Sequence, residues 1–554
     1  MRQTYRLRTW PLLVAVVLTL LAGCAPSSLP NAAPAGIIRW SLEGISDITR
    51  LDPARLGSNQ ENIPIYLIFG GLVRINDRLE IVGEGAERWS VSADGTIYTF
   101  NLRRNLKYGD GTQATAQHFA ATLARSIAPA TGTDFAMTFL EHVVGAHDVR
   151  AGKVTSLRGV QVLDDYTLVI TLDSPRGYFL SQLTYGLTYL VPPGKIEAAG
   201  ANWLNSAFGT GPFRVKVYEE GKGLLLEGNP FYWAGLPGVQ AVQFRFYLTT
   251  DAAFSAYLAN EVDVMGSVQS GIPTNRLAET KGKPDYQTIS APVMRYIGFS
   301  NVLPPFNNVF VRQAFAQALD RSELVPVLGD TVALAERILP QGFPGADQPI
   351  TPLGFNPVGA RAVLGLAGFV SGNDLPPVTL TYDQSDRDLE LVAHVLQRNW
   401  RETLGIDVYL EPVMLERLNS RLDSMNTSPS DPRNAMQMYL SIWGADYPDP
   451  QNFISLQLQS QSPYNNGHWT SAEFDRLVSQ ADQMSGAQGQ RERFGLYREA
   501  EQIAVNEVGW LPLYSPQVTL AIRPTVRGLL PTVTPQGILA TDWTRVRVVA
   551  EPGA

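Results

Sequence analysis

The residues best suited to bind a charged ligand stand together in one short segment. Its carboxylate belongs to Asp446, and its other members are Trp443, Gly444, Ala445 and Tyr447. A carboxylate can hold an ammonium group through charge-assisted hydrogen bonds. Aromatic ring faces, including that of Trp469 further along, attract the same cation. The segment therefore predicts a binding site for a cationic group.

An alternating pattern places this segment at the end of a strand. Residues Met436 to Trp443 have the composition of a strand, so Gly444 to Asp446 would form the turn that follows it. Folds that combine helices with parallel sheets bind ligands beyond the carboxyl ends of their strands. A simpler interpretation, in which Asp446 only caps a turn before Pro448, remains open.

Common catalytic motifs are missing from the chain. There is no Gly-x-Ser-x-Gly, Ser-x-x-Lys or His-Glu-x-x-His motif and no phosphate-binding loop. His142 and His147 are five positions apart, which puts them on different faces of a helix and does not suit a zinc pair. We therefore predict no catalytic residue, no metal site and no cofactor, and keep an envelope hydrolase as the alternative.

A strand, a helix and a strand would position the segment within an α/β domain. Val378 to Tyr382 and Ile406 to Leu410 have strand patterns, and between them Leu389, Val392 and Trp400 share one helical face. Such a crossover implies that the two strands are parallel. Further strands are expected at Ile97 to Leu102, Tyr166 to Leu172 and Val242 to Phe246, and helices from Ser471 and from Gln490 to Glu507.

The first residues resemble an export signal. Three arginines precede an apolar run from Pro11 to Leu21, which is too short for the roughly 20 apolar residues of a membrane span. Leu21-Ala22-Gly23-Cys24 resembles the bacterial lipobox, which implies cleavage after residue 23 and a lipid on Cys24, the only cysteine. We expect a signal peptide at 1–23 and a tether at 24–35; an unpaired cysteine in a discarded leader is the alternative.

Charge and composition narrow the class of partner. The chain has 44 Lys and Arg against 52 Asp and Glu, and without the three leader arginines the count is 41 against 52, a net charge of −11. A surface of this sign repels nucleic acid. Aromatic residues make up 10% of the chain, which suits a globular protein with aromatic-lined pockets.

Several motifs, in order along the chain, resemble the family 5 solute-binding proteins of ABC importers. The resembling motifs are Leu51-Asp52-Pro53-Ala54, Ala93-Asp94-Gly95-Thr96, Gly209-Thr210-Gly211-Pro212-Phe213, Gly228-Asn229-Pro230-Phe231-Tyr232-Trp233, Pro304-Pro305-Phe306-Asn307, Val311-Arg312-Gln313-Ala314-Phe315, Trp443 to Pro450, and Leu511-Pro512-Leu513-Tyr514. Oligopeptide- and dipeptide-binding proteins are the best-known members of that family.

The resemblance implies roles for individual residues. In peptide-binding members the aspartate of Trp-x-x-Asp, here Asp446, takes the α-ammonium group of the ligand. Gly444 and Ala445 would let the peptide backbone approach as an added strand; the alternative is that Gly444 serves only the turn. Tyr514, in the last motif, is a further candidate ligand residue.

The chain also departs from the family pattern at two positions. Many members carry Glu before Gly-Leu where this chain has Gly70, and oligopeptide receptors have an arginine near the ligand carboxylate where it has Leu440. The resemblance therefore does not indicate how a ligand carboxylate would be bound or how long the ligand is.

The resemblance implies an α/β fold of the periplasmic-binding-protein-like class II, with two hinged lobes and an additional domain. Lobe I would comprise 36–75, 186–293 and 518–554, the additional domain 76–185, and lobe II 294–517. The hinge would lie near Val293 and Met294 and between Ser515 and Val518. A ligand that contacts both lobes would favour the closed state.

We therefore expect a monomeric receptor in the cell envelope, anchored by lipid to the outer face of the cytoplasmic membrane or in the periplasm. It would bind di- to oligopeptides and deliver them to an ABC permease and ATPase complex. The alternatives are a nickel chelate, an opine or an oligosaccharide as ligand, or a signalling receptor of the same fold.

Overall fold

The computed structural model describes residues 36–56, 59–131, 133–267, 270–280, 282–429, 431, 433–486, 489–529 and 541–549. The predicted signal peptide, Cys24 and the tether lie outside the described residues. Within the described residues, no helix is both long enough and apolar enough to cross a bilayer.

One 12-stranded sheet extends through both halves of the molecule. Its main path has the order β16-β15-β17-β13-β18-β11-β1-β10-β9-β8, and β12 and β14 join it at β18. The strands are β1 (Ile37–Glu43), β8 (Phe213–Glu219), β9 (Gly223–Gly228), β10 (Ala241–Tyr247), β11 (Val264–Met265), β12 (Tyr286–Ser290), β13 (Val293–Phe299), β14 (Val332–Leu334), β15 (Val378–Asp383), β16 (Val408–Val413), β17 (Met438–Gly444) and β18 (Trp510–Ile522).

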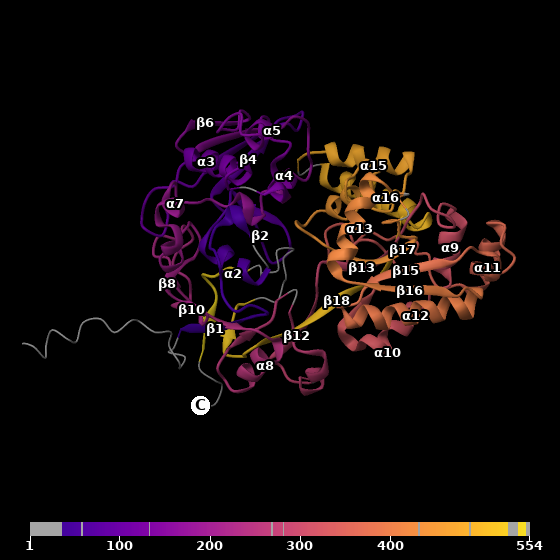
Figure 1. The fold of residues 1–554 in the computed structure, drawn as a ribbon. Coiled ribbons are helices and arrows are strands. Elements are labelled where there is room, and N and C mark those ends of the chain that lie inside the picture. The colour runs from indigo at the N-terminus through magenta and orange to yellow at the C-terminus, as the bar shows by residue number, and fades with distance from the viewer. Residues whose placement is uncertain are drawn as a thin grey trace, which may run out of the picture.

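The long strand β18 joins the two halves of this sheet. Its residues up to Pro516 pair with β13 and β14, and those from Gln517 pair with β12 and β11. Figure 1 shows β18 running from the body on the right to the body on the left. The second connection is the short segment between β12 and β13. The chain therefore crosses between the halves near residues 291–292 and 516–517.

A separate four-stranded antiparallel sheet lies above the left half of the large sheet in Figure 1, in the order β4-β5-β7-β6. The helix α3 (Ala116–Ile127) packs on it and buries Phe119, Leu123 and Ile127, which are spaced four apart. The four strands are β4 (Ala86–Val91), β5 (Ile97–Leu102), β6 (Val160–Asp164) and β7 (Thr167–Thr171). Two small antiparallel pairs complete the described strands: β2 (Val73–Ile75) with β3 (Ile81–Gly83), and β19 (Val526–Arg527) with β20 (Arg547–Val548).

The longest helix, α12 (Arg387–Leu404), buries an apolar face against β15 and β16. Its Trp400 is fully buried and donates an indole hydrogen bond to the Phe315 backbone oxygen. The remaining helices are α2 (Asn59–Ile68), α4 (Asp134–Leu140), α5 (Ala146–Arg150), α6 (Phe179–Gln182), α7 (Lys195–Ala199), α8 (Thr250–Leu258), α9 (Val309–Gln317), α10 (Val325–Leu328), α11 (Pro357–Leu366), α13 (Leu415–Thr427), α14 (Ser455–Leu458), α15 (Ala472–Gln483) and α16 (Gln490–Asn506).

Buried apolar side chains form several distinct cores. One takes its residues from 38–69, 189–291 and 518–546, and another takes all but one of its members from 72–190. Two more lie on either side of the sheet formed by β13 to β17 and use only residues 294–514. The exception in the second core is Tyr447, which comes from the right-hand body.

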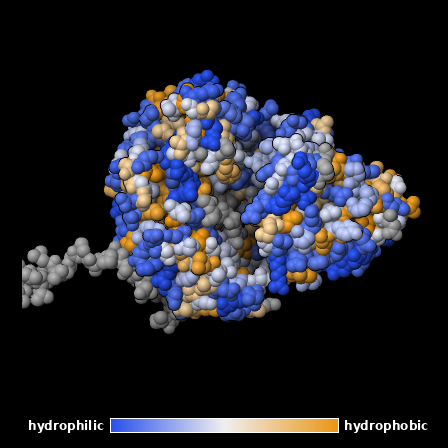
Figure 2. Space-filling model, viewed as in Figure 1, coloured by the Kyte–Doolittle hydropathy of each residue, from blue (hydrophilic) through white to orange (hydrophobic). Residues whose placement is uncertain are grey.

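The structure confirms the α/β class and the predicted crossover. β15, α12 and β16 follow one another, and Val378 pairs in parallel with Val408. The other predicted strands and helices are also present, most with bounds within two residues of those expected. Viewed in the same direction, the surface is hollowed between the two bodies (Figure 2).

Candidate functional site

The predicted turn lies at the end of β17, which terminates at Gly444. β15 and β17 are parallel neighbours, so the turn lies at the carboxyl end of both strands. This is the edge at which α/β folds place ligands. Trp443 is half-buried and Gly444 is exposed, whereas Ala445 is buried and donates its N–H to the Pro292 oxygen, 2.9 Å away.

Asn452 holds the turn in shape. The indole Nε1 of Trp443 donates to the backbone oxygen of Asn452 (3.0 Å) and to its Oδ1 (3.1 Å). The backbone N–H of Asp446 donates to the same Oδ1, at 3.2 Å. Asn452 is fully buried in a short 3₁₀ helix, Pro450–Asn452. The sequence analysis missed this residue, and its only signal was a polar side chain close after the turn.

Asp446 is half-buried in the turn after β17. Burial raises its pKa to about 7, and the neighbouring Asn452 side chain offsets part of that rise. At neutral pH the group is therefore divided between its charged and neutral forms. A cation placed beside it would favour the carboxylate.

Two tyrosines from the other body lie close to Asp446. Burial is the main cause of the raised pKa of Tyr185, and the charge of Asp446 raises it further. The same charge contributes in a smaller way to the raised pKa of Tyr66, in α2. Both phenols remain neutral hydrogen-bonding groups at physiological pH. The carboxyl group thus faces polar aromatic groups that lie more than 250 positions away in the sequence.

Two aromatic residues occupy different places from the ones predicted. Tyr447 is 1% exposed and packs against Tyr178 and Phe139, with ring centroids 6.3 and 6.1 Å away. Trp469 is equally buried and meets the edge of Phe474. Each ring belongs to one of the buried apolar cores described above. Both rings therefore support the turn from within the protein and do not face a ligand. Of the predicted aromatic residues near Asp446, Trp443 alone is half-open to solvent.

The edge of β17 beside this turn is open over several residues. β15 pairs with β17 only at Met438 and Tyr439 among the described residues, whereas β13 pairs with it as far as Gly444. Side-chain exposure increases from Ser441 onward. A Cβ on Gly444 would meet only Val293, at 3.5 Å. The last residues of β17 therefore offer backbone groups and space on one side.

Tyr514 belongs to another cavity, of about 210 Å³, whose lining includes none of residues 443–447. It pairs with Arg295 across β13 and β18 and is almost fully buried. Arg295 in turn forms an ion pair with Asp386, at 2.7 Å. The structure thus separates Tyr514 from the group around Asp446, although both lie at the junction of the two bodies.

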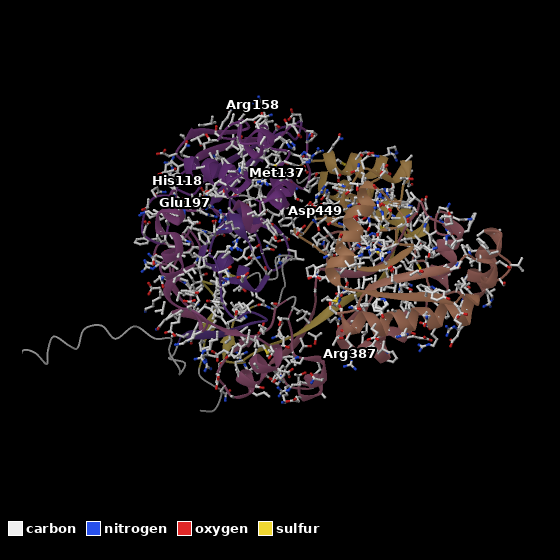
Figure 3. The ribbon with its side chains drawn as sticks, in the orientation of Figure 1. His118, Met137, Arg158, Glu197, Arg387 and Asp449 are labelled. Carbon is white, nitrogen blue, oxygen red and sulfur yellow. The ribbon has the colours of Figure 1, made fainter. Side chains whose placement is uncertain are left out.

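The contact between the two bodies on the side opposite β18 contains a buried ion pair. Arg493 lies 2.9 and 2.5 Å from the two oxygens of Asp449, and both side chains are at most 4% exposed. Figure 3 shows Asp449 between the two bodies. Ser181 from the left-hand body lies 3.5 Å from the same carboxylate. Among the described residues, no cluster of His, Cys, Asp and Glu could hold a metal ion.

Comparison with known proteins decides the family. The model for bacterial extracellular solute-binding proteins, family 5, matches residues 80–465. The chain belongs to this family. Its members are solute-binding proteins, and the predicted resemblance is confirmed.

Individual family 5 proteins are similar along almost the whole chain. YgiS of Escherichia coli K12, a probable deoxycholate-binding periplasmic protein, is 29% identical over 534 residues, which cover 94% of this chain and 95% of YgiS. The periplasmic oligopeptide-binding protein OppA of the same organism is 27% identical and covers 93% and 94%. The solved unliganded open form of MppA, a periplasmic murein tripeptide-binding protein, is 26% identical with a TM-score of 0.81, covering 93% of this chain and 98% of MppA. The two-lobed, class II binding-protein fold is therefore confirmed.

The departures from the family pattern can now be located. Leu440 is buried in the apolar core beside β13, so no charged group stands at that position. A Cβ added to Gly70 would lie 3.3 Å from Oε1 of Glu84. Glu84 is 6% exposed and accepts a hydrogen bond from Nε1 of Trp233, at 3.0 Å. Glu84 therefore places a buried carboxylate next to Gly70, the position at which many family members carry Glu.

Proposed function

We propose that the protein is the extracytoplasmic receptor of an ABC importer and that it binds peptides between its two lobes. The observation that carries this proposal is the position of Asp446, a carboxyl group with a pKa near 7 at the carboxyl end of β17. A peptide's α-ammonium group would supply the positive charge that shifts this group to its ionised form. Trp443 presents a half-buried ring beside it.

Strand addition would hold the rest of the peptide. The edge of β17 after Tyr439 is not covered by β15, and backbone groups there can pair with an extended ligand. Such pairing uses no ligand side chain and gives low sequence preference. Gly444 leaves room for the second backbone, and Tyr447 supports the turn from within the core.

The proposed lobes follow the observed cores. Lobe I (36–75, 186–293 and 518–554) matches the core built from residues 38–69, 189–291 and 518–546, and the additional domain (76–185) matches the core built from 72–190. Lobe II (294–517) contains the two cores on either side of β13 to β17. Closure would bend the chain at its two crossings, near residues 291–292 and 516–517.

We further propose that the mature protein begins at Cys24 and is anchored by a lipid on that residue, with 24–35 as its tether. The relatives with periplasmic names support a place outside the cytoplasm. Delivery to a permease would then require no catalytic residue, because the ligand is released unchanged. Tyr514 would contribute from the cavity of about 210 Å³ at the lobe junction.

The name of YgiS raises a second candidate, a bile-salt anion. Asp446 argues against it, because a carboxylate in the cleft would repel an anionic ligand. Measuring the binding of peptides and of deoxycholate therefore distinguishes the two candidate functions.

The deciding experiment uses protein purified without its leader. Native mass spectrometry would identify any ligand that copurifies, and calorimetry with di- to pentapeptides and with deoxycholate would measure binding to the wild type and to Asp446→Ala. We expect peptides to bind and the substitution to weaken them at least a hundredfold, because it removes a charge-assisted contact. N-acetylated peptides, which lack the ammonium group, serve as the matched ligand control. Equal binding of acetylated and free peptides, or no peptide binding, would overturn the proposal.

A further inference from the structure

The two bodies of the molecule meet again on the far side from β18. The chain crosses between them near residues 291–292 and 516–517, at one end of β12 and within β18. The second contact joins the proposed additional domain, residues 76–185, to lobe II. Figure 1 shows it at the top, where α15 lies beside that domain, whereas β18 lies near the bottom. The hollow between the bodies in Figure 2 therefore lies between the crossings and this second contact.

Tyr447 forms the apolar part of the second contact. It belongs to lobe II, yet its ring lies in the core of the additional domain and is 1% exposed. The ring of Tyr178 stacks on it, with centroids 6.3 Å apart and an angle of 8° between the planes, and Phe139 meets it edge-on. Withdrawal of this ring would expose apolar surface of both bodies to water, which opposes separation of the contact.

Polar groups surround that ring. The backbone N–H of Gly177 donates to the backbone oxygen of Asp482, 2.7 Å away. The hydroxyl of Ser181 lies 3.5 Å from an oxygen of Asp449. Arg493, also in lobe II, holds that carboxylate through two buried contacts. The additional domain therefore meets a surface of lobe II that is already fixed in shape.

Two glycines of the additional domain allow a close approach at this contact. A Cβ added to Gly177 would overlap the backbone oxygen of Met484 and lie 2.9 Å from Cδ of Arg493. A Cβ added to Gly95 would lie 2.8 Å from Oγ of Ser485. The two bodies are therefore packed here as closely as neighbouring segments in a protein core.

This contact does not depend on closed lobes. The overall structure is similar to the unliganded open form of MppA, and the contact is formed in it. Opening of the lobes therefore does not require the contact to break. A rotation that keeps both the contact and the chain crossings intact must have its axis through the two places.

We propose that the contact between the additional domain and lobe II is a second pivot, which stays formed while the lobes close about an axis through it and β18. The inference rests on the proposed function, because it concerns closure on a bound peptide. Tyr447 directly follows Asp446, so a permanent contact would hold the ammonium-binding turn against the additional domain in the open state. A peptide would then bind there by its amino end before the lobes close.

Pairs of spin labels would follow the contact and the cleft separately. Every labelled variant carries Cys24→Ser, which removes the only native cysteine. One pair, Asp173→Cys with Gln480→Cys, spans the contact from two exposed positions. The other pair, Leu248→Cys with Leu415→Cys, uses exposed residues that follow the carboxyl ends of β10 and β16. These are the edges at which such sheets bind ligands.

Double electron–electron resonance would measure both distances with and without saturating Ala-Ala-Ala. We expect the cleft distance to shorten and the contact distance to stay narrow and unchanged. A contact distance that changes on binding, or is broad in the free protein, would overturn the pivot and leave the proposed function intact. An unchanged cleft distance with bound peptide would also overturn the pivot. If neither Ala-Ala-Ala nor other di- to pentapeptides bind to protein that is folded by circular dichroism, the proposed function fails as well.

Gly177→Ala provides a second test. Its methyl group would push the contact apart at Met484 without removing a polar side chain, and Gly177 has no positive φ that would disfavour alanine. We expect the affinity for Ala-Ala-Ala to fall about tenfold, because the turn would no longer be held in place before binding. Gly365→Ala, at an open position of α11, is the matched control and should bind as the wild type does. Equal affinities of the two variants would overturn this inference.

Discussion

The indole nitrogen of Trp443 donates hydrogen bonds to both oxygens of Asn452, the backbone oxygen at 3.0 Å and Oδ1 at 3.1 Å. Because the same Oδ1 also accepts the N–H of Asp446, one amide side chain fixes the aromatic and the acidic residue of the turn relative to each other. The geometry of the site thus depends on a residue that need not contact the ligand.

Asn452→Ala should weaken ligand binding and destabilise the fold. The substitution leaves the Asp446 N–H without its acceptor in a partly buried place, which costs about 1–3 kcal/mol. Chemical denaturation and calorimetry would measure the two effects. In a double-mutant cycle with Trp443→Phe, the affinity losses should be non-additive, since both substitutions disturb one network. Strictly additive losses would show that Asn452 does not position Trp443.

Peptide affinity should depend on pH through Asp446. With a pKa of about 7, the carboxylate form rises from about 3% at pH 5.5 to about half at pH 7, so affinity should rise about sixteenfold over that range. Above about pH 8 it should fall again as the peptide α-amine loses its proton. Tyr66 and Tyr185 have raised pKa values and stay neutral throughout. Calorimetry between pH 5.5 and 8.5 would test this, and Asp446→Asn should lose the rising limb.

The same pKa shift sets the sign of one contribution to stability. The folded protein binds the Asp446 proton more tightly than the unfolded chain, in which the carboxyl group has its ordinary pKa of 3.8. This contribution is therefore fully present below pH 3.8 and is lost as the pH rises to about 7. Relative to the wild type, Asp446→Asn should become progressively more stable over that interval, as measured by denaturant midpoints. A constant difference would contradict the raised pKa.

A larger residue at Gly444 should weaken all peptides alike. The glycine has no positive φ, and its Cβ would meet only Val293 at 3.5 Å, so Gly444→Val should fold normally. Its side chain would occupy space that an added strand needs. The affinities of Ala-Ala-Ala and of unrelated tripeptides should fall by similar factors, with an unchanged melting temperature. Selective loss of one peptide would indicate a side-chain contact instead of strand addition.

Local patterns made much of the fold predictable. Alternation and helical spacing placed β15, α12 and β16 because each element shows its buried face within a few residues. The surroundings of Asp446 were not predictable in this way. Tyr66 and Tyr185 lie near it only through tertiary folding, and Tyr447 is buried because Phe139 and Tyr178, from the additional domain, enclose it. Sequence patterns therefore located the turn but not its neighbours.

Removing one partner of the buried ion pair between Asp449 and Arg493 should destabilise the fold more than removing one partner of a surface pair. Arg493→Met leaves the Asp449 carboxylate buried without its cation, which costs about 3–5 kcal/mol. Arg476 and Glu473, a pair more than half exposed on α15, provide the matched control, and Arg476→Met should cost less than about 1 kcal/mol. Urea denaturation would measure both. Similar losses for the two variants would mean that the Asp449 environment is more hydrated than its burial indicates.

Ligand binding should make the molecule more compact. The two lobes are joined by β18 and by the connection between β12 and β13, and MppA, whose unliganded open form has a similar structure, provides the expected starting state. A peptide that contacts both lobes stabilises the closed state by its differential affinity. Small-angle X-ray scattering should therefore show a smaller radius of gyration when a binding tripeptide saturates the wild type. The radius of gyration of Asp446→Ala should not change at the same peptide concentration. The N-acetylated form of the peptide should likewise leave the radius of the wild type unchanged. A radius that stays constant in the saturated wild type would mean that binding occurs without closure, so that a permease would have to recognise something other than lobe position.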